Sequence, residues 1–561
     1  MKVQQITQDN KQLHVTPQFK GGVDGFLRFF ATNQAMGANL VDVAFMVTPR
    51  TTLDTIKRGP DAGLETGRRE ASGTANHTLI GVYGSIAGAI AALLMGMKKK
   101  FGVKANPIMA APETINILAE NKVNNMESQK EYLRETLKNV RAFNPSSEKA
   151  ELDGYVKLEK LFKKEELEEV INMLDNAISD EKMNFKKWAN EKTPDSFEVL
   201  INKITEKTGA QSKYILDSAR REGAKSETNL RTLLEDIYKV SEAFNKKEVV
   251  KAFEEQKAAG KSILENKFIK SFARYGKTKS IAGFAIASAV GMSIQPLNMY
   301  LTKKKTGQDG FVGVEGRTKD TSTGFKFLKA GSAAAFFAMV LSTLNGEKKG
   351  LSKLSPKGFM GKMAFKGFWP TLSQLKGVYG LTIISRLFSA RDKDELRESL
   401  TKDTLGFLSW LVLGDFVNKM TAEALDKKLS KTVMNRPNDV AQKGFWERVF
   451  KSSLKNRDEI LIEALADGGI STVKNENGKT IAKNFKEMMK DLENMKGKDQ
   501  LKAMTKKRLG VLNWAQLAGY AFSGLVLGIG IPNLNIYITN KLDKKRKAQA
   551  EMQQQSEAAK A

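Results

Sequence analysis

The tripeptide Gly276-Lys277-Thr278 resembles the end of a phosphate-binding loop, in which backbone amides and a lysine hold a nucleotide. The full motif requires a glycine five positions before Gly276, but Ser271 stands there. The motif must also follow a β-strand, whereas Lys267–Tyr275 has the pattern of a helix end. We therefore do not expect nucleotide binding at this tripeptide.

A second pattern with chemical potential is a run of glycines at every third position, Gly307, Gly310, Gly313 and Gly316, between lysine-bearing flanks. The backbone amides of such a loop could bind an anion. A flexible connection between two helices explains the same pattern without a ligand, and it is the interpretation that we favour.

Residues for hydrolytic or metal chemistry are scarce. The chain has no cysteine, which excludes thiolate nucleophiles and thiolate metal sites, and its only histidines are His14 and His77. Neither histidine lies beside a nucleophile-elbow motif, and an interfacial or capping role is expected for His77. The carboxylate pairs Glu165–Glu166 and Glu168–Glu169 lie near lysines, which is typical of a solvated helix face. We expect a protein that is not an enzyme, with no catalytic residue, cofactor or metal.

The overall charge points to an anionic partner. The 561 residues include 91 Lys and Arg against 63 Asp and Glu, a net charge of +28. Nucleic-acid modules gather such charge on one face, often with stacking aromatics. Here the lysines cluster beside apolar segments, which favours anionic lipid headgroups and makes nucleic acid an unlikely partner. The mean hydropathy of −0.37 indicates that membrane segments are mixed with large polar regions.

Four apolar segments carry the membrane hypothesis: residues 71–97, 280–302, 330–346 and 509–540. A helix needs about 20 mostly apolar residues to cross a hydrocarbon core. The shorter segment 330–346 is expected to form a hairpin with 280–302. Small residues four positions apart allow helices to approach closely in lipid. The residues expected to pack helices in this way are Gly84, Gly88, Gly283, Ala287, Gly291, Gly524 and Gly528.

Basic clusters flank these segments. They are expected to contact lipid headgroups through Lys98, Lys99, Lys100, Lys303, Lys304, Lys305, Lys541, Lys544, Lys545, Arg546 and Lys547. Trp514 and Tyr537 stand near the two ends of the last segment, about 35 Å apart along a continuous helix, and are expected to mark two membrane interfaces. Gly528, Gly530 and Pro532 could break this helix, so a re-entrant hairpin is the alternative.

Two further regions give weaker apolar signals. Phe29–Pro49 is apolar apart from Asp42, and Phe368–Gly414 contains apolar pieces that are interrupted by Lys376, Arg386 and the charged stretch Arg391–Glu398. Asp415 follows the last piece and is expected to mark a segment end, paired with Lys419 one helical turn later.

The polar regions have amphipathic helical periodicity. One such face comprises Leu167, Val170, Ile171, Leu174 and Ile178. The domain organisation that we predict is an N-terminal region with a weak apolar segment (1–70), a membrane helix (71–101), a polar helical bundle (102–279), a membrane hairpin region (280–420), a second polar helical module (421–508), and a membrane segment with a basic tail (509–561).

These patterns predict an all-α, multi-segment helical membrane protein with two polar helical modules. The leading functional hypothesis is a non-enzymatic membrane scaffold or assembly component, with a homo-oligomer or protein partner bound through the polar modules. The alternatives are a pore or transporter-like bundle and a soluble phage or virion structural protein with buried apolar helices. Both polar modules are expected on the cytoplasmic face of the cytoplasmic membrane, so cysteines placed at Ser226 and Ser471 would share one accessibility. Lysines flank the segments on both sides, so the positive-inside rule gives no clear orientation. The sequence also does not fix the number of crossings.

Overall fold

The computed structural model describes residues 26–28, 39, 42–145, 147–151, 153–210, 212–312, 317–344, 356–365, 370–409, 413–429, 433–436, 440, 443–475 and 477–558. Within these residues the protein is mostly helical, with 74% helix and few strands, so the all-α prediction is confirmed at that level. His14, Gly313, Gly316, Gly346 and parts of the two weakly apolar regions, including residues 29–38, lie outside the described residues.

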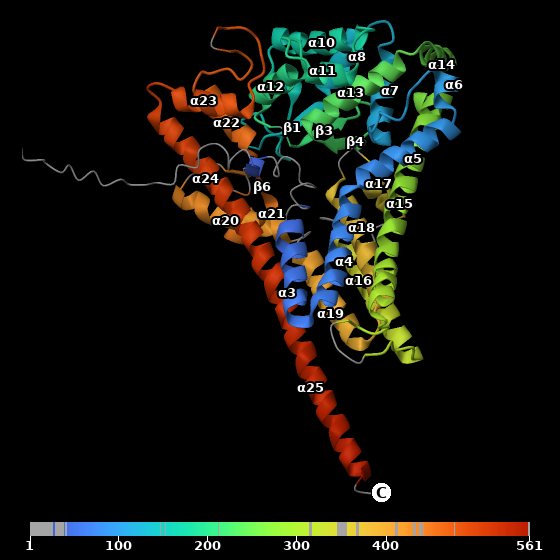
Figure 1. Ribbon diagram of the computed structural model, residues 1–561. Helices are drawn as coiled ribbons and strands as arrows, with labels where there is room; N and C mark the ends of the chain where they lie inside the picture. Colours follow the sequence, from blue (N-terminus) through green and yellow to red (C-terminus); the bar gives the residue numbers. More distant parts are fainter. Residues whose placement is uncertain are drawn as a thin grey trace, which may run out of the picture.

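A head of short helices encloses the largest hydrophobic core, at the top of Figure 1. Its helices are α6 (Met97–Phe101), α7 (Pro112–Asn124), α8 (Gln129–Lys138), α9 (Leu158–Leu161), α10 (Lys164–Ser179), α11 (Phe185–Asn190), α12 (Phe197–Thr208), α13 (Leu230–Phe244), α14 (Lys247–Ala258) and the 3-10 turn η2 (Ile263–Glu265). The predicted apolar face of α10 is confirmed, because all five of its residues are buried. Glu166 closes a capping box at the start of α10.

The head also contains an antiparallel four-stranded sheet with the order β2-β1-β3-β4. The strands are β1 (Val140–Phe143), β2 (Tyr155–Lys157), β3 (Tyr214–Asp217) and β4 (Lys225–Thr228). In the central pair, Arg141 lies opposite Ile215. Periodicity did not predict this sheet, since a strand of four residues or fewer is too short to give a clear alternating pattern.

A helical bundle extends from the head (Figure 1). It consists of η1 (Asp42–Val47, a π-helical turn), α3 (Thr48–Arg58), α4 (Pro60–Thr78), α5 (Ile80–Leu94), α15 (Lys267–Thr306), α16 (Thr323–Leu344), α17 (Pro356–Met363), α18 (Leu372–Ser389), α19 (Lys393–Leu408), α24 (Asp499–Phe522), η5 (Ser523–Gly530, π-helical) and α25 (Ile531–Ala558). Helix α15 joins the two parts, because Phe272 belongs to the head core and Ala287 to the bundle core.

The two arms of the predicted hairpin, 280–302 and 330–346, are not arranged as a directly packed pair. The segments form α15 and α16, which run in opposite directions, but α18 packs against both of them. The two arms are therefore joined through α18 rather than as a directly packed pair. Sequence could not indicate this, because α18 begins well after α16 and its apolar stretch is interrupted by Lys376 and Arg386.

The second polar module packs beside the head, at the same end of the bundle (Figure 1). Its elements are α20 (Gly414–Leu429), β5 (Met434–Asn435), α21 (Phe445–Lys451), β6 (Ser453–Leu454), α22 (Arg457–Asp467) and α23 (Phe485–Asn494). The module is tied to α12 of the head, where the Asn202 amide donates to the carbonyl of Lys483 at 3.1 Å. The Thr472 hydroxyl donates to Glu206 at 3.1 Å in the same contact region.

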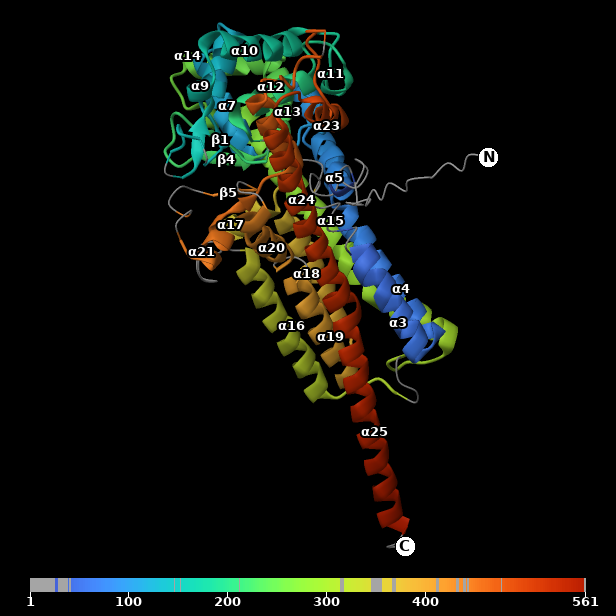
Figure 2. The same cartoon turned by 90° about the vertical axis from the view of Figure 1, so that its left-hand side faces the viewer.

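In the part of the chain that the structure describes, three helices are long and apolar enough to cross a membrane: Lys267–Thr306, Thr323–Leu344 and the continuous run Asp499–Glu557. The pair α4 and α5, bent by 50°, makes a fourth if it counts as one broken span. Only 33%, 22% and 39% of the apolar windows of the three helices are buried. Figure 2 shows that the bundle extends downward from the head and that α25 projects beyond the other helices.

Candidate functional site in the charged interior of the bundle

The predicted packing residues lie where helices approach each other. An ideal Cβ on Gly283 of α15 would lie 2.9 Å from the Cα of Gly84 of α5. An ideal Cβ on Gly88 would lie 3.1 Å from the Tyr275 hydroxyl. An ideal Cβ on Gly291 would lie 2.5 Å from the Thr382 hydroxyl of α18. Ala287 is fully buried, and its carbonyl accepts a hydrogen bond from Asn76. Gly524 and Gly528 of η5 both face Phe45 of η1.

The predicted headgroup residues are all exposed and lie at two opposite ends of the bundle. Lys98, Lys99 and Lys100 are on α6 at the head end. Lys303, Lys304 and Lys305 end α15 at the far end, where Lys305 pairs with Asp61 at 2.7 Å. The cluster 541–547 lies on α25, where Arg546 pairs with Asp394. The structure thus separates the basic clusters into two groups along the bundle axis.

The motifs for which the sequence favours no ligand have simple structural roles. Gly276, Lys277 and Thr278 lie within the continuous helix α15, not in a loop. Gly307 ends that helix with a left-handed backbone. Asp415 and Lys419 form the predicted ion pair at 3.0 Å, which confirms that prediction. His77 is fully buried in the last turn of α4, where its ring packs edge-on against Tyr379 at a centroid distance of 4.9 Å.

The interior of the bundle contains buried charges beside its apolar core, which the hydropathy pattern did not predict. Three helices supply most of the charges: α3, α4 and α19. Gly59 connects α3 to α4 with a φ of 94°, a conformation that favours glycine, and Pro60 then begins α4. This tight turn folds α3 back along α4, so that the polar faces of both helices meet α19.

One cluster of charges surrounds Glu70 of α4. Its carboxylate lies 3.1 Å from Arg69, 3.3 Å from both Arg386 and Lys402, and 3.6 Å from Arg50. Arg386 also pairs with Asp403 at 3.1 Å. These residues come from α3, α4, α18 and α19, so the cluster joins four helices.

A second cluster lies nearer the far end of the bundle. Arg391 bridges Glu65 at 2.6 Å and Glu395 at 2.9 Å, which links the start of α19 to α4. Arg58 pairs with Glu398 at 2.5 Å and with Asp54 at 3.5 Å. These pairs are largely buried, and breaking one partner of such a pair typically costs about 3–5 kcal/mol.

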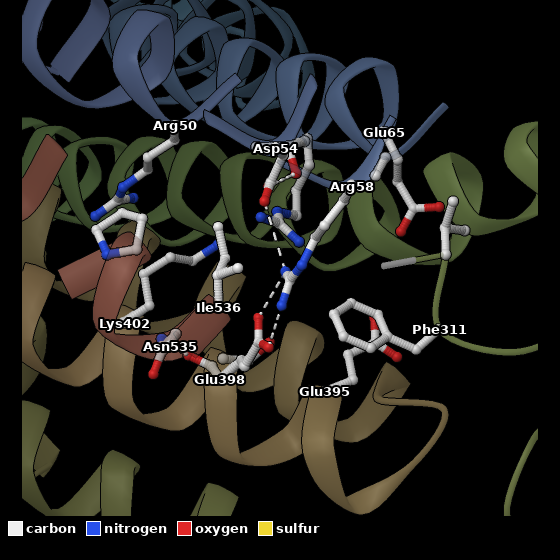
Figure 3. Close-up of a pocket in the computed structure, with 16 residues that line it drawn as sticks. Arg50, Asp54, Arg58, Glu65, Phe311, Glu395, Glu398, Lys402, Asn535 and Ile536 are labelled. Carbon is white, nitrogen blue, oxygen red and sulfur yellow. Dashed lines mark hydrogen bonds and ion pairs between the residues drawn. The ribbon is translucent and has the colours of Figure 1, made fainter. Parts of the chain in front are cut away.

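A small pocket lies between α3, α4, α19 and α25. Figure 3 shows Arg50 and Lys402 at one end of it and Arg58 with Glu398 near its middle. Phe311, from the connection after α15, closes the other end.

Arg50 is the pocket residue whose hydrogen bonding is least complete. It is 1% exposed, and its Nε donates to the carbonyl of Leu527 at 3.2 Å. Neither terminal nitrogen of its guanidinium has a hydrogen-bond partner among the described residues. The nearest charge contact of these nitrogens is the one with Glu70, at 3.6 Å. Among the residues that the structure describes, no group of three or more His, Asp or Glu could hold a metal ion.

The sequence does contain a signal for this interior. Arg391, Glu395, Glu398 and Lys402 recur every three or four residues, as do Arg50, Asp54 and Arg58 of α3. Each series forms one stripe of a helix. Further charges on α19, including Lys393, Arg397 and Asp403, lie outside its stripe, so a count along the chain does not show which charges are buried together.

Comparisons with protein-family models, with curated proteins and with solved structures find no match to this chain.

Proposed function

We propose that this chain is an integral membrane protein whose helical bundle provides a pathway for a small polar solute, and that it is not an enzyme. The observation that carries the proposal is the distribution of charged and apolar side chains in the bundle. Two clusters of charged side chains are buried beside its apolar core, while large apolar side chains face outward. A water-soluble bundle instead places its charged face outward.

The apolar exterior supports the membrane part of the proposal. Val82, Ile86 and Ile90 form an exposed stripe on α5, on the side away from Gly84 and Gly88. Exposed apolar residues continue around the bundle on α15, α16, η5 and α25, including Leu297, Phe337, Leu525 and Leu534. Contiguous exposed apolar surface of this kind is rare on soluble monomers and favours lipid contact.

Aromatic residues support the same assignment. Trp514 and Tyr537 are 61% and 63% exposed, as interfacial anchors require. Trp446 and Phe450 of α21 are exposed as well, and both stack on Phe416. We propose that α21 lies in the membrane interface on the side of the head. Both polar modules then lie on one face, which we assign to the cytoplasm.

The charged interior supports the pathway part of the proposal. Ionisable residues inside a membrane are costly and commonly line substrate or ion pathways. The pocket also lies beside a π-helical segment, because Pro532 and Asn535, which line it, come soon after η5 in the same continuous helix. Segments of π-helix within α-helices are frequent at functional sites.

Flux measurements test the pathway. Ala62 of α4 lines the pocket and is 6% exposed. In proteoliposomes, osmotic-swelling flux of small anions, cations and neutral solutes should include at least one permeant class, and Ala62→Phe should abolish that flux by filling the pocket. Ala334→Phe, at an exposed position on α16, is the matched control and should retain it. Absence of flux for every class, or equal flux in both variants, would refute the pathway.

A scaffold remains the second candidate, and one observation favours it. Most charges in the interior are paired across helices, which fixes α3, α4, α18 and α19 in one arrangement. Alkaline carbonate extraction separates both membrane proposals from a soluble virion protein: an integral protein stays in the membrane pellet, whereas a soluble protein is released.

A further inference from the structure

We propose that the pocket at Arg50 is a binding site for a small oxyanion, held by Arg50 and Lys402. The ligand class is defined by anionic oxygen atoms, such as those of a phosphate or carboxylate group. This inference rests on the proposed function, because it names the chemical class of solute that the interior pocket would take.

The first argument is the state of Arg50. A guanidinium presents its donors in a planar fork that matches two oxygens of a carboxylate or phosphate. At Arg50 both terminal nitrogens are buried, lack hydrogen-bond partners among the described residues, and belong to a side chain that lines the pocket. Leaving buried donors of a charged group unsatisfied is unfavourable, so an incoming acceptor would be stabilised there.

The second argument is the separation of charge along the pocket. The carboxylates at its middle and far end, such as Glu398 and Glu65, are paired with Arg58 and Arg391. At the other end, Arg50, Arg69 and Lys402 line the pocket, and their shared carboxylate, Glu70, does not.

The charge balance behind this end adds to the attraction. Glu70 is also shared with Arg386, so four cations surround one carboxylate. Asp403, which pairs with Arg386, adds a second negative charge to this group. Asp42 adds a third, and it accepts a hydrogen bond from Thr74, which lies one helical turn after Glu70. Four cations thus face three carboxylates, and the excess positive charge is on the side of the pocket.

Binding of inorganic phosphate to the purified full-length protein in detergent tests the site. Thermal unfolding is followed with phosphate up to about 50 mM, at constant ionic strength maintained with chloride. Phosphate should raise the midpoint temperature of the wild type relative to chloride. Arg50→Gln should weaken the apparent affinity about ten-fold or more, as expected for loss of a charge-assisted bidentate contact.

Three further variants keep the test decisive. Lys402→Gln should also weaken phosphate binding, and it serves where Arg50→Gln does not fold. Arg50→Lys keeps the charge without the fork and should bind with intermediate affinity. Lys305→Gln removes an exposed cation at the far end and should bind like the wild type. Equal stabilisation of the wild type, Arg50→Gln and Lys402→Gln, or no stabilisation of the wild type beyond chloride, would overturn the site.

Native mass spectrometry distinguishes the two sources of oxyanion. An anionic phospholipid retained by the wild type and lost from Arg50→Gln would identify the ligand as a headgroup, and retention of phosphate alone would identify a free anion. Either result supports the site. Binding and flux fail independently: phosphate binding without flux refutes only the pathway, and flux of cations without phosphate binding refutes only the oxyanion site.

Discussion

Replacing Gly283 with leucine should destabilise the bundle strongly while leaving membrane insertion intact. An ideal Cβ at Gly283 lies 2.9 Å from the Cα of Gly84 and 2.9 Å from Cε2 of Phe365. Carbon atoms in favourable contact lie about 3.5–4.0 Å apart. The first atom of a new side chain therefore requires α5 and α15 to separate by about 0.6–1.1 Å, and leucine adds three more carbons.

Overpacking of this kind typically costs about 1–3 kcal/mol, and we expect the upper end because one of the opposing atoms is backbone. A loss of about 3 kcal/mol corresponds to a fall in midpoint temperature of about 6–12 °C for a cooperative unit of about 150–250 residues. Circular dichroism at 222 nm, recorded during heating in detergent, measures this fall. Insertion should persist, because leucine is more apolar than glycine.

Gly331→Leu is the matched control for the same substitution on an exposed surface of the bundle. Gly331 is exposed on α16, and an ideal Cβ there meets no atom within 4 Å. Its midpoint temperature should stay within about 1 °C of the wild type or rise slightly. If Gly283→Leu unfolds at the wild-type temperature, or if both variants lose equal stability, close packing of α5 on α15 does not hold the bundle together.

Three further predictions concern the polar parts. Burial raises the pKa of Asp236 well above its ordinary value of 3.8, so the folded protein binds more protons than the unfolded chain above that pH. The unfolding free energy should therefore fall as pH rises from about 4 towards the folded pKa, and denaturation of Asp236→Asn should lack this component. Neutralising the basic residues of 541–547 should weaken flotation with anionic vesicles most at low ionic strength, and an unchanged flotation there would exclude a headgroup role. Cysteines introduced at the exposed positions Glu222 and Asn477 should both resist an impermeant thiol reagent in intact cells and both react after lysis. Ser226 is buried and is therefore the poorer probe position. Protection of only one of the two cysteines would place the modules on opposite sides.

The apolar segments were the predictable part of this fold. Their length and lack of charge along 280–302 and 509–540 are local properties, and both segments form parts of long helices that could cross a membrane. Small residues at four-residue spacing also pointed to close contacts, since they leave one face of a helix without bulk. What these patterns could not give is the partner of each face, because α18 is placed between α15 and α16 by tertiary packing.

The charged site could not be predicted for a related reason. A window along the chain adds the hydropathy of all faces of a helix and does not show which charges are buried together. Arg386 and the stretch Arg391–Glu398 therefore interrupt the apolar pattern, and the boundary predicted at residue 70 divides α4, which continues to Thr78. The structural role of these charges depends on Glu65 and Glu70, which lie more than 300 positions away in the sequence.

The energetics of such an interior bear on why it is charged. Replacing a buried ion pair with well-packed apolar side chains is often neutral or stabilising by about 1–4 kcal/mol. A bundle with leucine and alanine at the positions of Glu70, Arg386 and Lys402 could therefore be at least as stable as this one, and it would insert into a membrane more readily. Stability alone does not account for four cations around one carboxylate. The proposed recognition of a charged solute would account for both the excess positive charge and the donors of Arg50 that lack hydrogen-bond partners among the described residues, so we propose to look for function first in the interior of the bundle.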